Sequence, residues 1–300
     1  MAVSVMGAWM VDTRRLEQLL QQKGEPSSRA SAGSVPALVP SGGRRLAISG
    51  GPAQRSGTPS RAVARRSDPA IEAAWANLDP IRTDPAPSAR QRAFNALGRA
   101  PDLAKRFDVL RAQLEATFQK RNLRSLGISA PAMGAGASFT SAGLLASFGR
   151  RQELRVVGLD MHLAAPALHG FFEAAPAGSM RPMIDGDIPV ESHLQLAGPN
   201  LALGLNAQAD DNSVSAAVFE EMIADISDFL APDIIICDMP PLLDAGDAGL
   251  NLLPALDAVL LVVDARRTRA EDIAACERNL ADQTEFLGVI MNHSSAAGGR

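Results

Sequence analysis

Several segments of this 300-residue sequence carry residue types that can bind a phosphorylated ligand and a divalent cation. Residues 130–138 read Ala-Pro-Ala-Met-Gly-Ala-Gly-Ala-Ser and follow an apolar run. Glycines in such a loop let backbone N–H groups turn towards phosphate oxygens, and a closing Ser hydroxyl can reach Mg²⁺. Gly134, Gly136 and Ser138 are therefore candidate ligands, although Gly-Ala-Gly alone is also compatible with an ordinary turn. A lysine usually precedes that serine, but here the residue is Ala137, so the charge that contacts the β- and γ-phosphates is missing.

Polar residues end three other apolar runs. Asp238 follows Ile-Ile-Ile-Cys and precedes Met-Pro-Pro, an arrangement typical of a carboxylate that meets Mg²⁺ at the tip of a strand. Asp160 could orient water or a metal shell, and a helix cap or a solvated loop position explains it equally well. Asn292 could meet the edge of a nucleotide base or simply end a strand. These residues become a site only if one edge of a sheet collects them.

The sequence from residue 101 predicts such a sheet. Short apolar runs alternate with amphipathic segments, which indicates an α/β fold of the P-loop NTPase kind, with a mostly parallel sheet and helices on both faces. Functional groups then gather at the carboxyl ends of the strands. Strands are expected at 125–129, 155–159, 233–237, 258–263 and 286–291, and helices at 102–120, 138–148, 214–230, 250–253 and 270–281.

The first 100 residues differ in composition from the rest. They hold 14 Lys and Arg against 7 Asp and Glu, whereas the remaining 200 hold 15 against 26. Between 24 and 66 the chain is rich in Pro, Ser and Arg and has almost no periodic apolar residues, which predicts disorder. The arginines have no aromatic neighbours that could stack on bases, so no nucleic acid partner is expected. The predicted division is a basic, largely disordered arm over 1–100 with short helices near 12–22 and 67–78, an α/β domain over 101–295 and a tail over 296–300.

The two helices of the arm are candidate docking segments. Each has apolar residues on one stripe, and Trp75 is the largest apolar side chain of the second helix. An apolar helix of this kind either binds a partner or packs on its own domain, and the sequence leaves both open.

Composition also bears on the compartment. Cys237 and Cys276 are the two cysteines, and they suit a reducing cytoplasm without a disulfide framework. No run reaches the ~18 apolar residues of a membrane span. We expect a soluble cytoplasmic chain.

Together, the segments from about 107 to 292 resemble the bacterial tyrosine kinase family of capsule and exopolysaccharide synthesis, relatives of the MinD and ParA ATPases. The family loop is similar to S-P-x-P-G-x-G-K-S/T, and its second motif to I-D-A-D-L-R-R-P. In that second motif His162 replaces the second aspartate, and Ala164 and Ala165 replace the arginines. The matching positions are Pro131, Gly134, Gly136, Ser138, Asp160, Leu163, Pro166, Asp238, Pro240, Pro241, Asp247, Ala248, Thr268, Gly288 and Asn292.

The resemblance implies a site for ATP or ADP with Mg²⁺. By analogy, Ser138 and Asp238 would hold the metal, and Asp160 and Asp238 would be the catalytic carboxylates of an active member. The nucleotide would contact Gly134, Gly136, Ser138 and Asn292. The family works beside a membrane-spanning polysaccharide co-polymerase, so a place at the inner face of the cell membrane, reached through that partner, is implied as well.

Departures from the family bear on activity and assembly. The lysine is replaced by Ala137, and the sequence contains no tyrosine, whereas the family phosphorylates a C-terminal tyrosine cluster. The oligomerising helix of the family carries E-x-x-R-x-x-R, and the aligned residues are Lys105, Asp108 and Arg111, which reverses two charges. Ring assembly through that interface is not expected, and another kind of oligomer stays open.

These departures favour a pseudokinase that supports polysaccharide synthesis and export by binding, with weak nucleotide binding or none. Two alternatives stay open. One is an active ATPase or protein kinase that receives a cation from its partner. The other is a spatial regulator like MinD or ParA, whose signature lysine would align with Ala132.

Overall fold

The structure, a computed structural model, describes residues 9–10, 68–82, 101–172, 174, 178–211, 213–281 and 283–292. The helix predicted near 12–22, the linker over 24–66 and the tail over 296–300 lie outside these ranges. Within them, no helix is both long enough and apolar enough to cross a bilayer.

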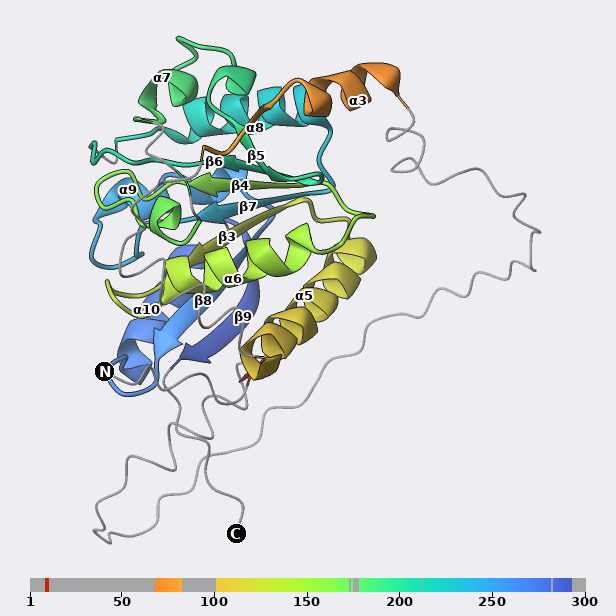
Figure 1. Cartoon of the computed structure of the whole chain (residues 1–300). Helices are drawn as coiled ribbons and strands as arrows, with labels where there is room; N and C mark the ends of the chain where they lie inside the picture. The colour runs from red at the N-terminus through yellow and green to blue at the C-terminus, as the bar shows by residue number, and fades with distance from the viewer. Residues whose placement is uncertain are drawn as a thin grey trace, which may run out of the picture.

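A nine-stranded sheet forms the centre of the fold, in the order β1-β9-β8-β3-β7-β4-β6-β5-β2 (Figure 1). The six strands from β9 to β6 are mutually parallel. At the edges, β1 runs antiparallel to β9, β5 runs antiparallel to β6, and β2 is parallel to β5. The strands are β1 (Trp9–Met10), β2 (Asp79–Pro80), β3 (Ser125–Ser129), β4 (Val156–Asp160), β5 (Gln195–Gly198), β6 (Leu201–Gly204), β7 (Ile234–Asp238), β8 (Ala258–Asp264) and β9 (Glu285–Asn292).

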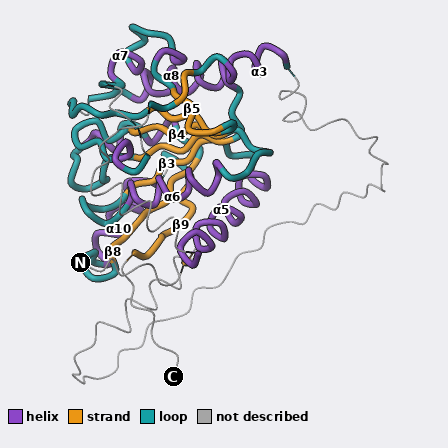
Figure 2. The backbone as a smooth tube through the Cα atoms, in the orientation of Figure 1, coloured by secondary structure: helices purple, strands orange, loops and turns teal. Residues whose placement is uncertain are grey.

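Helices cover both faces of the sheet, as predicted, with loops connecting the layers (Figure 2). The α-helices are α3 (Pro69–Ala76), α5 (Pro101–Arg121), α6 (Ala137–Gly149), α7 (Arg181–Ile184), α8 (Ala216–Leu230), α9 (Asp247–Leu250) and α10 (Ala270–Leu280). Short 3₁₀ helices are η1 (Leu168–Gly170), η2 (Val190–Ser192) and η3 (Leu253–Ala255).

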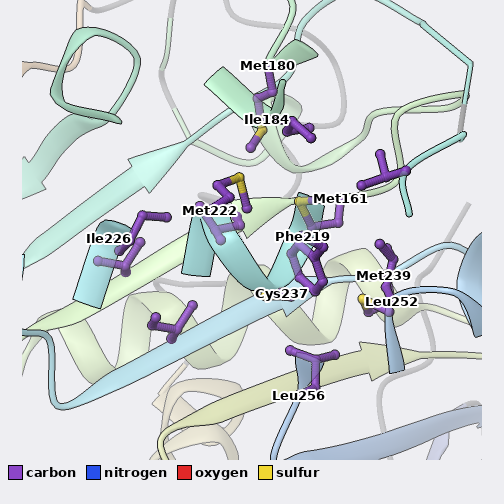
Figure 3. Packing of buried hydrophobic residues seen from close by; sticks show 14 of the residues in the cluster. Met161, Met180, Ile184, Phe219, Met222, Ile226, Cys237, Met239, Leu252 and Leu256 are labelled. Carbon is purple, nitrogen blue, oxygen red and sulfur yellow. The ribbon is translucent and has the colours of Figure 1, made fainter. Parts of the chain in front are cut away.

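Each central strand contributes side chains to two hydrophobic clusters, because its side chains alternate between the two faces of the sheet. In β8, Val259 and Leu261 belong to the cluster that also contains residues of α3, α7, α8 and α10, whereas Leu260 and Val262 belong to the cluster that contains residues of α5 and α6. Figure 3 shows part of the first cluster, where Phe219 of α8 lies close to β7. Full burial of one such side chain stabilises the fold by about 1.5 to 3 kcal/mol. The paired layers hold the strand ends in fixed positions.

The predicted fold class is confirmed, and the five predicted strands are each correct to within one residue at either end. The helix expected at 250–253 is wrong in register: the chain instead forms α9 and then η3. Within α9, Gly249 packs closely on the chain after β7, since an added Cβ would lie 3.2 Å from the Pro240 carbonyl oxygen. The strands β5 and β6 and the helix α7 were not predicted.

The helix predicted at 67–78 is present as α3, and it packs on its own domain. Asp68 caps it by accepting a hydrogen bond from the Ala70 N–H at 2.9 Å. Trp75 is 3% exposed, and its indole Nε1 donates to the Leu230 carbonyl oxygen at the end of α8 at 2.7 Å. The guanidinium of Arg155 lies 5.4 Å from the Trp75 ring centroid and pairs with Glu72 at 2.7 Å. The predicted domain start at residue 101 therefore needs correction, because α3 and β2 are part of the sheet domain.

Replacing Trp75 by alanine is expected to destabilise the domain by about 3 kcal/mol, since the ring loses its burial and its two polar contacts. The conservative change Trp75→Phe keeps most of the apolar contact, removes the donor to Leu230, and is expected to cost about 1 kcal/mol. Urea denaturation gives both values, and hydrogen exchange of the β2 and β5 amides reports detachment of α3. Equal stability of the alanine variant and the natural chain would contradict this account of the docking.

Candidate functional site

The loop between β3 and α6 has the backbone of an anion cradle. Gly134 and Gly136 adopt positive φ angles of 81° and 103°, a conformation that residues with a Cβ rarely adopt. A Cβ on Gly136 would also collide with the side-chain amide of Asn292. The helix α6 begins directly afterwards at Ala137. The first N–H groups of that helix have no partner within it and point back towards the space that the loop surrounds. Phosphate binding at such a helix start needs backbone groups only.

Side chains from neighbouring strands hold the loop in shape. The Asn292 Nδ2 donates to the Ala135 carbonyl oxygen at 3.0 Å, and the Met133 N–H donates to Asp244 Oδ2 at 2.8 Å. The Ser129 hydroxyl donates to the Pro240 carbonyl oxygen at 2.7 Å. Asn292 thus braces the loop, and its predicted contact with a nucleotide base stays a prediction.

Two carboxylates lie side by side below the loop. Asp160 ends β4 and Asp238 ends β7, where they are register partners, and both are fully buried. The Asp238 Oδ1 accepts a hydrogen bond from the Ser141 hydroxyl at 2.9 Å, and the Ser138 hydroxyl also bonds to this carboxylate. The Asp160 Oδ2 accepts from the Leu168 N–H at 2.9 Å. The structure thus brings Ser138, Asp160 and Asp238 together, and their predicted roles as metal ligands and catalytic groups stay predictions.

One oxygen of each carboxylate lacks a hydrogen-bond partner within the described part of the chain, namely Asp160 Oδ1 and Asp238 Oδ2. Burial raises the pKa of Asp238 to about 6, against the lowering effect of the Ser138 and Ser141 hydroxyls. Burial and the Asp238 charge raise the pKa of Asp160 well above its usual range. Two buried oxygens that lack partners in a like-charged pair fit a cation.

Two carboxylates and a hydroxyl are the ligands expected of a Mg²⁺ ion that is bound together with a nucleotide phosphate. That ion is commonly held by one or two carboxylates together with phosphate oxygens and water. The described residues contain no group of three or more His, Cys, Asp or Glu that could hold a metal by themselves. Asp160, Asp238 and the Ser138 hydroxyl would supply the protein side of such a site.

A cleft of about 260 Å³ opens between the loop and the segment after β4. The first residues of α6, Ala137 and Ser138, lie on its wall, as do His162, Phe139 and Phe171. Burial lowers the pKa of His162, so the imidazole is neutral at pH 7 and supplies no charge. Among the residues that the structure describes, the cleft lining has no Lys or Arg. These lining residues are Ala130, Ala132, Met133, Gly134, Ala135, Gly136, Ala137, Ser138, Phe139, His162, Ala165, Ala167, Phe171, Met239 and Pro241.

A smaller cavity of about 110 Å³ lies against the same loop and is closed by the turn between β8 and α10. Arg267 and Thr268 come from that turn, whereas Asp264 ends β8 and Asp272 lies in the first turn of α10. The sequence analysis noted Thr268 only as a family match and missed Arg267. The signal was available, since the end of a central parallel strand is where polar groups of such a site are expected.

Comparison with known proteins finds similarity to tyrosine kinases. No family model matches the sequence. The chain is 25% identical over 194 residues to tyrosine-protein kinase YwqD of Bacillus subtilis strain 168, a match that covers 63% of this chain and 80% of that protein.

Solved structures of kinase domains share the fold. The kinase domain of the Escherichia coli tyrosine kinase ETK superposes with a TM-score of 0.60 at 18% identity, over 73% of this chain and 85% of that one. The BceF tyrosine kinase domain gives 0.54 at 17% identity, over 75% and 97%. The VpsO kinase domain gives 0.54 at 20% identity, over 64% and 96%. The resemblance expected from the motifs is thereby confirmed: the chain is similar to a bacterial tyrosine kinase and shares the fold of such kinase domains.

Proposed function

We propose that this chain is a pseudokinase, a tyrosine-kinase-like subunit that binds Mg²⁺-nucleotide and does not transfer phosphate. The observation that carries the proposal is that the groups expected to bind nucleotide and metal are kept at this site, whereas the lysine expected for phosphoryl transfer is missing. The loop, Ser138 and the Asp160–Asp238 pair are retained, whereas alanine stands at 137. The lysine stabilises the charge of the transferring phosphoryl group, so its loss costs more in catalysis than in binding. The absence of tyrosine from the sequence also leaves no acceptor for tyrosine autophosphorylation within it.

The process served would be synthesis and export of a capsule or exopolysaccharide. Support comes from the resemblance to bacterial tyrosine kinases, including the relative in Bacillus subtilis. In this proposal the chain is cytoplasmic and reaches the inner face of the cell membrane through a polysaccharide co-polymerase. The conformation of the cleft, with nucleotide or without it, would be the signal that the partner reads.

Assembly through the helix α5 is not part of the proposal. Asp108 pairs with Arg150, the residue after α6, at 2.6 Å and accepts from the Ser147 hydroxyl at 2.6 Å. Arg111 donates to the same hydroxyl at 3.2 Å and pairs with Glu115 at 2.5 Å. These side chains are thus used within the subunit, which supports a chain that does not form the ring of its relatives.

Isothermal titration with Mg²⁺-ATP and Mg²⁺-ADP is the direct test. We expect micromolar binding by the natural chain and none by Asp238→Ala, because that change removes the metal carboxylate. We also expect no release of phosphate from bound ATP over hours. Absence of binding at millimolar nucleotide would refute the nucleotide-sensing function.

The retained carboxylates favour one alternative, an ATPase or kinase that receives its missing cation from a partner. Steady ATP turnover in the presence of the co-polymerase, abolished by Asp238→Ala, would establish that alternative and reject the pseudokinase.

A further inference from the structure

One basic side chain lies at the phosphate loop. Among the described residues that line the 260 Å³ cleft and the 110 Å³ cavity, Arg267 is the single Lys or Arg. The two spaces share Ala132, Met133, Gly134 and Ala135, so they flank the same stretch of loop backbone. A nucleotide phosphate held by that backbone would therefore lie near the Arg267 side chain.

The Arg267 guanidinium lies close to the backbone of the loop. Its Nη1 lies 4.0 Å from the place that a Cβ on Gly134 would occupy. Gly134 has no side chain, so nothing of its own separates the guanidinium from the loop backbone. The residue thus faces the turn in which the N–H groups of the cradle lie.

A tight turn after β8 presents Arg267. Its N–H donates to the Asp264 carbonyl oxygen at 3.0 Å, and the Thr268 N–H donates to the same oxygen at 2.8 Å. The Thr268 hydroxyl accepts from the Asp264 N–H at 3.1 Å. The backbone under the arginine is therefore held, and only its side chain needs ordering when an anion binds.

The carboxylates of the same cavity are engaged elsewhere. Asp264 Oδ1 accepts from the Arg266 N–H at 2.9 Å, and Asp272 Oδ2 accepts from the Arg269 N–H at 3.0 Å. Arg266 pairs with Asp264 at 3.4 Å, and Arg269 pairs with Glu271 at 3.1 Å. Within the described ranges, Arg267 makes no ion pair. Its charge is available to an incoming phosphate.

We propose that Arg267 is the cation of this nucleotide site, supplied from the β8–α10 turn in place of the lysine missing at 137. The inference rests on the nucleotide binding of the proposed function and names the residue that makes it strong enough to act. A guanidinium can bind phosphate oxygens through two parallel N–H donors, which suits a group that approaches the loop from outside. The lining of its cavity, as far as the structure describes it, contains neither Asp160 nor Asp238, so in this proposal Arg267 strengthens binding and does not restore phosphoryl transfer.

Titration calorimetry with Mg²⁺-ADP and Mg²⁺-ATP tests Arg267 directly. We expect Arg267→Ala to weaken binding about ten-fold to one-hundred-fold, the usual effect of a charge-assisted hydrogen bond. Arg267→Lys keeps the charge and loses the paired donors, so an intermediate loss is expected. The matched control is Arg269→Ala, which removes an equal charge two residues away and is expected to change affinity less than two-fold. Thermal unfolding of each variant without nucleotide checks that the fold is intact.

The outcomes separate the two proposals. Binding by the natural chain that Arg267→Ala leaves unchanged would overturn the role of Arg267 and leave the nucleotide-sensing function standing. Equal losses in Arg267→Ala and Arg269→Ala would also overturn it, since the effect would then be one of general charge. Failure of the natural chain to bind either nucleotide would reject both.

Discussion

Asp238→Asn is expected to raise the free energy of unfolding at pH 7 by about 3 kcal/mol while abolishing Mg²⁺-dependent nucleotide binding. The carboxylate is fully buried beside Asp160, and its pKa of about 6 lies about two units above the usual value of an aspartate. One unit corresponds to about 1.4 kcal/mol. An amide of the same shape removes the charge, and Ser138 and Ser141 can still donate to its oxygen.

The sign of the pH dependence follows from a raised pKa. The folded state binds the proton of Asp238 more tightly than the unfolded state does, so this contribution to stability is complete below about pH 4 and is lost as the pH rises to about 6. Stability of the natural chain should therefore fall between pH 4 and 6 by more than that of Asp238→Asn. Added Mg²⁺ should recover part of the loss in the natural chain at pH 7, since the metal replaces the proton.

Urea denaturation at several pH values, with and without Mg²⁺, measures these differences. Asp225→Asn, an exposed position on α8, is the control for removal of one negative charge. A variant Asp238→Asn that is less stable than the natural chain at pH 7 would mean that the carboxylate is already neutralised by something other than a proton.

Ala137→Lys is expected to have the largest effect on activity. Position 137 is the first residue of α6, half-buried on the wall of the cleft, and lysine is well tolerated in a helix. A lysine there should strengthen Mg²⁺-ATP binding about ten-fold to one-hundred-fold. Because loss of one such electrostatic group typically costs about 10² to 10³ in turnover, we expect ATP hydrolysis to rise at least about one-hundred-fold above the natural chain.

Phosphate release and calorimetry check both expectations for Ala137→Lys. The control is Ala137→Met, which adds a side chain of similar length without charge and should restore neither binding nor turnover. If the lysine variant binds nucleotide tightly without hydrolysing it, the loss of function extends to the second motif. His162, Ala164 and Ala165 would then be the next positions to restore.

The strands that carry the site were predictable because they are buried on both faces. β7 and β8 are uninterrupted apolar runs that end in an aspartate, so the pattern shows both the element and the position of its functional group. β5 and β6 have four residues each, too few to show a period, and β5 is only partly buried. Their place at the edge depends on contacts that the local sequence does not contain.

Long-range contacts explain what else the sequence could not predict. The hydrogen bond from Trp75 to Leu230 joins residues 155 positions apart, so packing of α3 on the domain could not be distinguished from docking on a partner. From the sequence, Asn292 could contact a base edge or simply end a strand, and its bond to the Ala135 carbonyl oxygen became visible only in three dimensions. Arg267 follows the end of a central strand, where polar groups of a site are expected, but its distance from the loop is not visible in the sequence. Its assignment to the nucleotide site rests on the closeness of its guanidinium to Gly134 in the structure.

The two short strands at the ends of the sheet have a consequence for solubility. β1 lies outside β9 and β2 lies outside β5, and both come from the first 80 residues of the chain. An uncovered edge strand offers free N–H and C=O groups on which another molecule can build a continuous sheet. β1 and β2 are each two residues long, so the sheet ends on short edges, and removal of β1 or β2 would expose the longer β9 or β5 as a template for pairing with another molecule.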